Sequence, residues 1–192
     1  MTKSRIEAFS DGVVAIIITI MVLELKLPEH HDLTALFELV PVFLAYVLSF
    51  TIVGIYWNNH HHLFHAVKHI GGWVLWANLH LLFWLSLLPF TTGFMEESGF
   101  EPMPVALYGL DLAACALAYF LLVRSLLAVH GVNSDFARAL GSDLKGKLSL
   151  LAYVVSMPAA FVSIWISVAI FVGVALIWIV PDRRFSRAGR TE

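Results

Sequence analysis

Residues 5–27 read RIEAFSDGVVAIIITIMVLELKL, and this stretch decides the class of fold. No charge interrupts the run from Gly12 to Leu23, while Asp11 and Glu24 stand at its two ends. A helix needs about 20 mostly apolar residues to cross a bilayer, so the stretch predicts a membrane-spanning helix. It also raises a question, because Ser10 and Asp11 stand at the start of a run where apolar residues would insert at lower cost.

The composition of the whole chain is that of a membrane protein. Of its 192 residues, 59% are hydrophobic and 14% are charged, whereas a soluble domain has about 25% charged residues. The net charge of −2 gives no indication of nucleic-acid binding. The single cysteine excludes a disulfide within the chain. Asp11 interrupts the first apolar run and no A-x-A site follows, so we expect a retained helix and not a cleaved signal peptide.

Six apolar segments predict an all-α integral membrane protein with six transmembrane helices in one domain, residues 1–192. The block 148–180 is too long for one helix of ordinary tilt. Pro158, which two alanines follow, is therefore expected to divide it. The six predicted helices cover approximately residues 6–27, 34–58, 71–93, 103–128, 140–158 and 161–180.

The basic residues predict the orientation of these helices. Six spans place eleven of the twelve lysines and arginines on one side, and the loops of the other side carry only Lys26 with seven acidic residues. The positive-inside rule then places both termini in the cytoplasm of a multi-pass plasma-membrane protein. The eleven are Lys3, Arg5, Lys68, Arg124, Arg138, Lys145, Lys147, Arg183, Arg184, Arg187 and Arg190.

Asp11 has two possible environments in such a protein. It is either an interfacial acid that stays in water, or an anchor that accepts hydrogen bonds from a neighbouring helix, with Ser10 beside it. Donors of the right kind stand at the end of the second predicted helix, near the same membrane surface. These donors are Trp57, Asn59 and His60.

Other polar residues also allow more than one interpretation. His61 and His65 are four residues apart, a spacing that can hold zinc, but no Cys, Asp or Glu nearby completes the site, so we expect no metal. Asn78, His80 and Asp111 lie within predicted spans, either as proton relays or as hydrogen bonds between helices. The sequence contains no nucleophile–base pair, phosphate-binding glycine loop or paired carboxylates, so we expect neither an enzyme nor a cofactor.

Residues 5–11, R-I-E-A-F-S-D, resemble the R-x-x-x-F-S-D motif of the transmembrane protein 175 family of potassium channels. The motif is specific because it fixes a charge, an aromatic ring, a hydroxyl and an acid within seven residues. The resemblance extends over essentially the whole chain. Supporting family patterns are Trp57-x-Asn59-His60-His61, Leu88-Pro89-Phe90, and Trp178 with Pro181.

The resemblance implies a six-helix cation-channel fold unlike that of the usual tetrameric channels, without their T-V-G-Y-G filter. Single-unit members of the family form tetramers in which the first helix lines the pore. Counted from the motif, the pore and selectivity positions are Ile16, Thr19, Ile20 and Leu23, with Thr19 as a hydroxyl layer. The implied packing network that holds this helix comprises Arg5, Phe9, Ser10, Asp11, Trp57, Asn59 and His60.

These observations favour a homotetrameric, potassium-permeable channel that handles monovalent cations in a lipid bilayer. Four isoleucines offer no ligands, so the ring of Ile16 side chains would act as a barrier that ions cross by shedding water at a cost. The first alternative is a proton pathway or a proton-coupled transporter that uses Asp111, His80 and the histidine cluster. The second is a non-conducting membrane protein that serves interactions.

Overall fold

The computed structural model describes residues 2–28, 30, 32–67, 69–131, 133–140 and 143–179, and these residues form nine helices and no strand. Lys68, Pro181 and the four C-terminal arginines of the orientation argument lie outside the described residues. The helices are α1 (Lys3–Leu23), α2 (Leu33–Glu38), α3 (Val40–His65), α4 (Gly72–Leu85), α5 (Leu88–Glu97), α6 (Pro102–His130), α7 (Asp135–Leu140), α8 (Leu144–Val162) and α9 (Ile164–Ile179).

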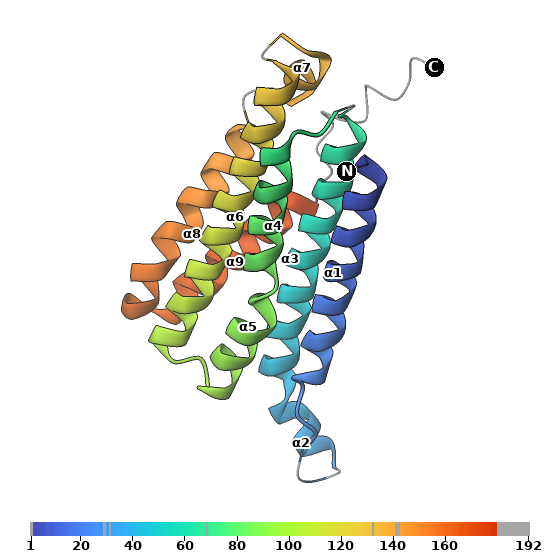
Figure 1. Ribbon diagram of the computed structural model, residues 1–192. Helices are drawn as coiled ribbons and strands as arrows, with labels where there is room; N and C mark the ends of the chain where they lie inside the picture. The colour runs from blue at the N-terminus through green and yellow to red at the C-terminus, as the bar shows by residue number, and fades with distance from the viewer. Residues whose placement is uncertain are drawn as a thin grey trace.

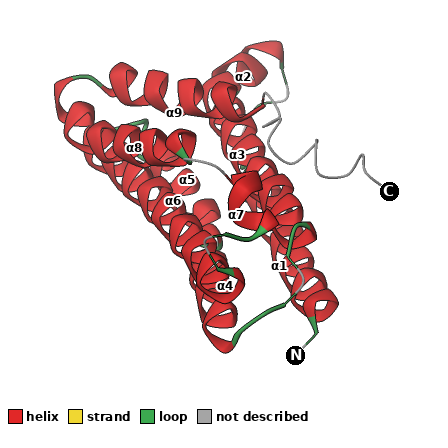
Figure 2. Ribbon diagram, turned by 90° about the horizontal axis from the view of Figure 1, so that it is seen from above, coloured by secondary structure: helices red, strands yellow, loops and turns green. Residues whose placement is uncertain are grey.

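The long helices run alternately up and down in a bundle (Figure 1). α1 packs against α3, α4 and α5, while α6 lies in the middle of the bundle and contacts α4, α5, α8 and α9. Seen from above, α1 and α3 lie on one side and α6 and α8 on the other (Figure 2). The largest fully buried side chains, among them Tyr108, Phe64 and Phe171, fill the space between these helices.

Four helical segments among the described residues are long and apolar enough to cross a membrane: Lys3–Leu23, Val40–His65, Gly72–Glu97 and Pro102–His130. α9 is apolar but has only 16 residues, and α8 does not meet the same length and hydropathy criterion. The chain is therefore an all-helical membrane protein. The predicted count of six spans does not follow from its helices alone.

The second predicted helix has different ends from those expected. The short α2 precedes it, and the side chain of Asp32 caps α2 by accepting a hydrogen bond from the Ala35 amide, 2.8 Å away. α3 then continues seven residues past the predicted end at residue 58. The predicted helix ended before the polar residues that follow Trp57. His60 and Phe64 are buried against the bundle, and this packing accompanies the continued helix.

The third predicted helix is broken into α4 and α5 at Ser86 and Leu87. Pro89 stands at the start of α5 and has no amide hydrogen to donate to the preceding turn. A proline in the first turn of a helix loses nothing, since amides there have no partner within the helix. The break therefore follows from the same Leu88-Pro89-Phe90 sequence that resembled a family pattern.

The last apolar block is divided into two helices as predicted, but the break does not lie at Pro158. α8 passes through Pro158 and ends at Val162, and the chain turns at Ser163, whose backbone is extended with φ −163° and ψ 123°. Ser167 of α9 then donates a hydrogen bond of 2.7 Å to the carbonyl of Ser156 in α8. A proline inside a helix loses one backbone hydrogen bond and bends the helix, at a cost of about 3 kcal/mol, but it does not have to end it. Here the contacts between α8 and α9 accompany a turn at Ser163 instead.

Gly109 lets α6 and α8 approach closely. A Cβ atom at this position would lie 2.6 Å from the hydroxyl oxygen of Ser156, which no real side chain could tolerate without a shift. Small residues at helix crossings are typical of membrane proteins, where close packing replaces the hydrophobic effect as the driving force.

Candidate pore helix and its anchor

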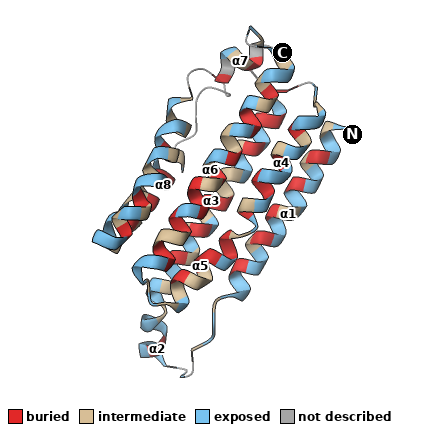
Figure 3. Cartoon of the chain, turned by 60° about the vertical axis from the view of Figure 1, so that its left-hand side comes forward, coloured by how far each residue is buried: buried red, intermediate tan, exposed pale blue. Residues whose placement is uncertain are grey.

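α1 has one buried face and one exposed face, although nearly all its residues from Gly12 to Leu23 are apolar (Figure 3). The buried residues are Ile6, Ser10, Val14, Ile17 and Met21. Their spacing of three or four places them in one stripe along the helix.

The opposite face is apolar and uncovered in the single chain. Ile16 is 58% exposed and Leu23 is 80% exposed, and Ile20, Gly12 and Thr19 are exposed with them. The four residues that the resemblance assigned to the pore therefore share this open face. Their role in permeation stays a prediction.

The hydroxyl of Thr19 is oriented by its own helix. Its Oγ1 donates a hydrogen bond of 2.9 Å to the carbonyl of Ile16. Because the hydrogen is used in this bond, the oxygen can present only lone pairs to whatever lies outside the helix. A group arranged in this way can accept from water or contact a cation.

The buried face of α1 is held by a chain of hydrogen bonds across three helices. The Nδ2 of Asn78 in α4 donates to Ser10 Oγ at 3.0 Å, and His60 Nε2 in α3 lies 2.8 Å from Asn78 Oδ1. Since a carbonyl oxygen only accepts, the hydrogen of the second bond belongs to His60 Nε2. The ring of His60 stacks on Phe64 with centroids 4.4 Å apart, so the imidazole is fixed on two sides.

Asp11 lies at the edge of this anchor and not inside it. Trp57 donates its indole hydrogen to Asp11 Oδ1 at 2.9 Å, as expected for one of the three proposed donors. Both side chains are exposed in the single chain, with Trp57 at 47%. Ser10, which seemed the secondary partner, is the buried residue of the pair.

The remaining motif residues lie away from the hydrogen-bonded chain. Arg5 and Phe9 are exposed. Asn59 lies two residues after Trp57, on a different side of α3. Its backbone carbonyl accepts a 3.3 Å hydrogen bond from Tyr119 of α6. Sequence reasoning did not assign Asn78 to this network, although an amide in an apolar helix was the available signal.

An acidic cavity adjoins the far end of α1. It has a volume of about 480 Å³ and lies between α1, the start of α3 and the α4–α5 segment, with Ile20, Glu24, Glu96 and Glu97 in its lining. Lys26 forms an exposed ion pair with Glu97 at 2.8 Å. The hydrogen bond and the charge of Glu97 raise the pKa of the Lys26 ammonium group above its usual value. The acids of the first and third loops thus meet at one end of the bundle.

Asp111 belongs to a second polar cluster, in the core of the bundle. It is 3% exposed, and Thr91 of α5 donates to its Oδ2 at 2.9 Å. Among the described residues, Asp111 Oδ1 is a buried oxygen with no hydrogen-bond partner. Thr92 and Tyr108 are close in sequence to Thr91 and Asp111, and their hydroxyls are hydrogen-bonded to Ser49 of α3 at 2.8 Å and 2.9 Å. Hydroxyl groups therefore connect α3, α5 and α6.

The structure does not join the other candidate relay residues to Asp111. His80 is exposed and accepts a 2.9 Å hydrogen bond from Trp84 on its own helix. The rings of His61 and His65 are 5.8 Å apart at the surface of α3. Within the part of the chain that the structure describes, no three His, Cys, Asp or Glu side chains are grouped to hold a metal ion.

Comparison with known proteins finds similarity to ion channels. Residues 5–89 match the family model described as the endosomal/lysosomal potassium channel TMEM175. A protein from Chryseobacterium sp. (strain P1-3), named as a potassium channel, is 50% identical over 188 residues, which are 98% of each chain. The TMEM175 of Mus musculus, named as an endosomal/lysosomal proton channel, is 32% identical over 132 residues, which are 62% of this chain and 26% of that protein.

A solved structure also resembles the bundle. The crystal structure of a lysosomal potassium-selective channel TMEM175 homolog from Chamaesiphon minutus superposes with a TM-score of 0.79 and 28% sequence identity. The match covers 93% of this chain and 96% of that one.

Proposed function

The chain belongs to the TMEM175 family, which consists of ion channels and not enzymes, and from this premise we propose that it is a potassium-permeable channel formed by four copies. The observation that carries the proposal is the open apolar face of α1. The stripe of Ile16, Ile20 and Leu23 is uncovered in the single chain, so it is available to lipid, to a partner subunit or to a pore, and the motif that opens the same helix favours the pore.

In the proposed assembly, the four α1 helices surround the axis and turn this face inward. The rings of Ile16 and Ile20 then form the constriction, and the Thr19 hydroxyls form a layer of oxygen atoms between them. An apolar ring has no ligands, so an ion crosses it hydrated or after shedding part of its water. K⁺ sheds water at lower cost than Na⁺, which favours K⁺ without a carbonyl filter.

The anchor of α1 gives this arrangement its rigidity. The Ser10–Asn78–His60 chain fixes the rotation of α1 about its own axis, so that the apolar stripe keeps one direction. The acidic cavity at the far end of α1 raises the local concentration of cations near one mouth of the pore. In this proposal K⁺ is the ion that passes through the pore, and the channel uses no cofactor.

The topology that we propose is one domain with six spans, both termini in the cytoplasm, in the plasma membrane. The distribution of basic residues supports it, and so does the alternation of helix directions in the bundle. We expect a reporter fused to the C-terminus to respond as a cytoplasmic one. A reporter response from the outer side would refute six spans.

Ion flux from liposomes tests the pore. We expect Ile16→Asn to raise conductance and to admit Na⁺ more freely, because a polar ring hydrates the constriction. Ile166→Asn is the matched control, since Ile166 is an exposed isoleucine of α9, remote in the chain from α1. If Ile16→Asn and the control conduct like the wild type, this face of α1 does not line the pore.

A proton pathway is the second candidate. It is favoured by the mouse relative, which is named as a proton channel, and by the partly unpaired, buried carboxyl group of Asp111. Gradients of K⁺, Na⁺ and H⁺ imposed separately on the same liposomes distinguish the two functions. Proton flux that Asp111→Asn abolishes, in the absence of K⁺ flux, would favour the proton pathway.

A further inference from the structure

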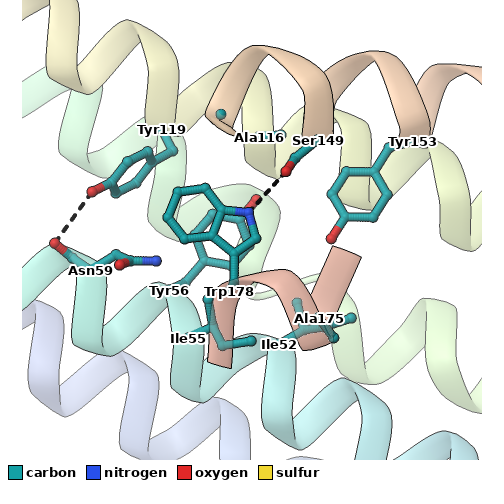
Figure 4. Close-up of a pocket in the computed structure, with 11 residues that line it drawn as sticks. Ile52, Ile55, Tyr56, Asn59, Ala116, Tyr119, Ser149, Tyr153, Ala175 and Trp178 are labelled. Carbon is teal, nitrogen blue, oxygen red and sulfur yellow. Dashed lines mark hydrogen bonds between the residues drawn. The ribbon is translucent and has the colours of Figure 1, made fainter. Parts of the chain in front are cut away.

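A cavity lies between α3, α6, α8 and α9, away from α1 (Figure 4). Its lining includes four aromatic residues and one amide, namely Tyr56, Asn59, Tyr119, Tyr153 and Trp178. No function described so far uses these groups. Asn59 is also the one residue of the Trp57-x-Asn59-His60 motif whose side chain has no place in the α1 anchor.

Some polar groups of the lining already have partners. The hydroxyl of Tyr119 donates to the backbone carbonyl of Asn59, and the indole of Trp178 donates to Ser149 Oγ at 2.8 Å. Both bonds appear as dashed lines in Figure 4.

Three other polar groups of the lining have no hydrogen-bond partner among the described residues. They are the hydroxyls of Tyr56 and Tyr153 and the side-chain amide of Asn59. Tyr153 is only 4% exposed, yet among the described residues its hydroxyl oxygen is not one of the unpaired atoms that lack accessible surface. The oxygen therefore keeps some accessible surface. The space that its hydroxyl reaches is therefore the cavity. A buried phenol without a partner is unfavourable, so something in the cavity is expected to pair with it.

The size of the cavity limits what it can hold. The volume open to the centres of water molecules is about 40 Å³. One water needs at least about 10–15 Å³ of such space, so the cavity has room for about three. A cavity that holds benzene measures about 150 Å³, which excludes an aromatic ligand of that size.

We propose that this cavity is a water-binding site, in which an ordered cluster of waters completes the hydrogen bonding of Tyr56, Asn59 and Tyr153. These groups come from α3 and α8, so the waters connect two helices that lie on either side of the cavity. α9 covers the cluster with Ala175 and Trp178. The residues of the motif at the end of α3 then act on two sides of that helix. Trp57 and His60 hold α1, and Asn59 binds internal water.

Hydroxyl-radical labelling of the purified wild-type channel tests the proposal, because X-rays generate radicals from bound water beside buried side chains. Tyr108 is the matched control, since it is equally buried and its hydroxyl is bonded directly to Ser49. We expect several-fold faster oxidation of Tyr153 than of Tyr108. Equal protection of the two tyrosines overturns the proposal.

A variant that fills the cavity gives an independent measurement. Ala175→Val adds two methyl groups to the lining and is expected to displace water, which slows the oxidation of Tyr153 and lowers the melting temperature because polar groups lose their partners. Ala169→Val makes the same change at an exposed position of α9 and is expected to alter neither. A dry cavity would instead be stabilised by filling. A higher melting temperature, or unchanged oxidation of Tyr153 in Ala175→Val, overturns the proposal.

Discussion

The two faces of α1 have nearly the same chemistry but opposite surroundings. Ile16 and Ile17 are neighbours in sequence, yet Ile16 is 58% exposed and Ile17 is 2% exposed. The only polar residue on the buried stripe, Ser10, is the one that is hydrogen-bonded to another helix. Ser10 is thus the point at which the buried face is hydrogen-bonded to another helix, while the opposite face is uncovered in the single chain.

The largest effect on stability is expected from the pair of isoleucines. Ile17→Ala removes side-chain atoms from a packed core and should lower the free energy of unfolding by about 2–5 kcal/mol. Ile16→Ala, on the open face, should change it by no more than about 0.5 kcal/mol. Thermal or denaturant unfolding in detergent measures both. Equal losses would show that the two faces are equally packed in the assembly.

The second largest effect on stability is expected at the Ser10 hydroxyl. Ser10→Ala leaves the Asn78 amide without its acceptor in the core, which costs about 1–3 kcal/mol. Ser125→Ala is the matched control, because the Ser125 hydroxyl donates to the carbonyl of Leu122 in its own helix, α6. Should both variants melt alike, the anchor does not hold α1.

Thr19→Ala should affect selectivity and not stability. It removes the oxygen layer from the open face, and we expect the preference for K⁺ over Na⁺ to fall less than tenfold, or by under about 1.4 kcal/mol. Thr51→Ala is the control, since that hydroxyl makes the same kind of bond within α3. Reversal potentials in planar bilayers give the ratio. An unchanged ratio in Thr19→Ala would remove the threonine layer from the mechanism.

The smallest effect is expected at Asp11. Asp11→Asn keeps an oxygen that can accept the hydrogen bond from Trp57, and this bond is exposed. The free energy of unfolding, measured by thermal melting, should therefore fall by no more than about 0.5 kcal/mol. A loss as large as that of Ser10→Ala would mean that assembly buries Asp11. The edge of the anchor would then be an interface between subunits.

The sequence predicted α1 well because length and apolar composition are properties of the segment itself. It could not predict which face is buried, since a run with no polar periodicity allows every rotation. The rotation depends on Asn78, 68 residues away, and no spacing in the sequence connects that amide with Ser10. The assignment of pore residues came from the family resemblance and stays a prediction.

The helix ends were harder to predict for a similar reason. α3 continues through a polar stretch because the bundle buries His60 and Phe64, and α8 continues through Pro158 because α9 packs against it. In both places contacts between helices outweighed the local signal. The sequence could not predict that Asn59 lines a cavity either, because four separate helices form that cavity.

The break between α4 and α5 has a mechanical consequence. α4 carries Asn78, which holds the start of α1, while α5 carries Glu97, which pairs with Lys26 just beyond the end of α1. The two ends of α1 are therefore attached to the two helices that meet at Ser86 and Leu87. A change in the angle between α4 and α5 would tilt α1 relative to its fixed anchor, and its far end would move most.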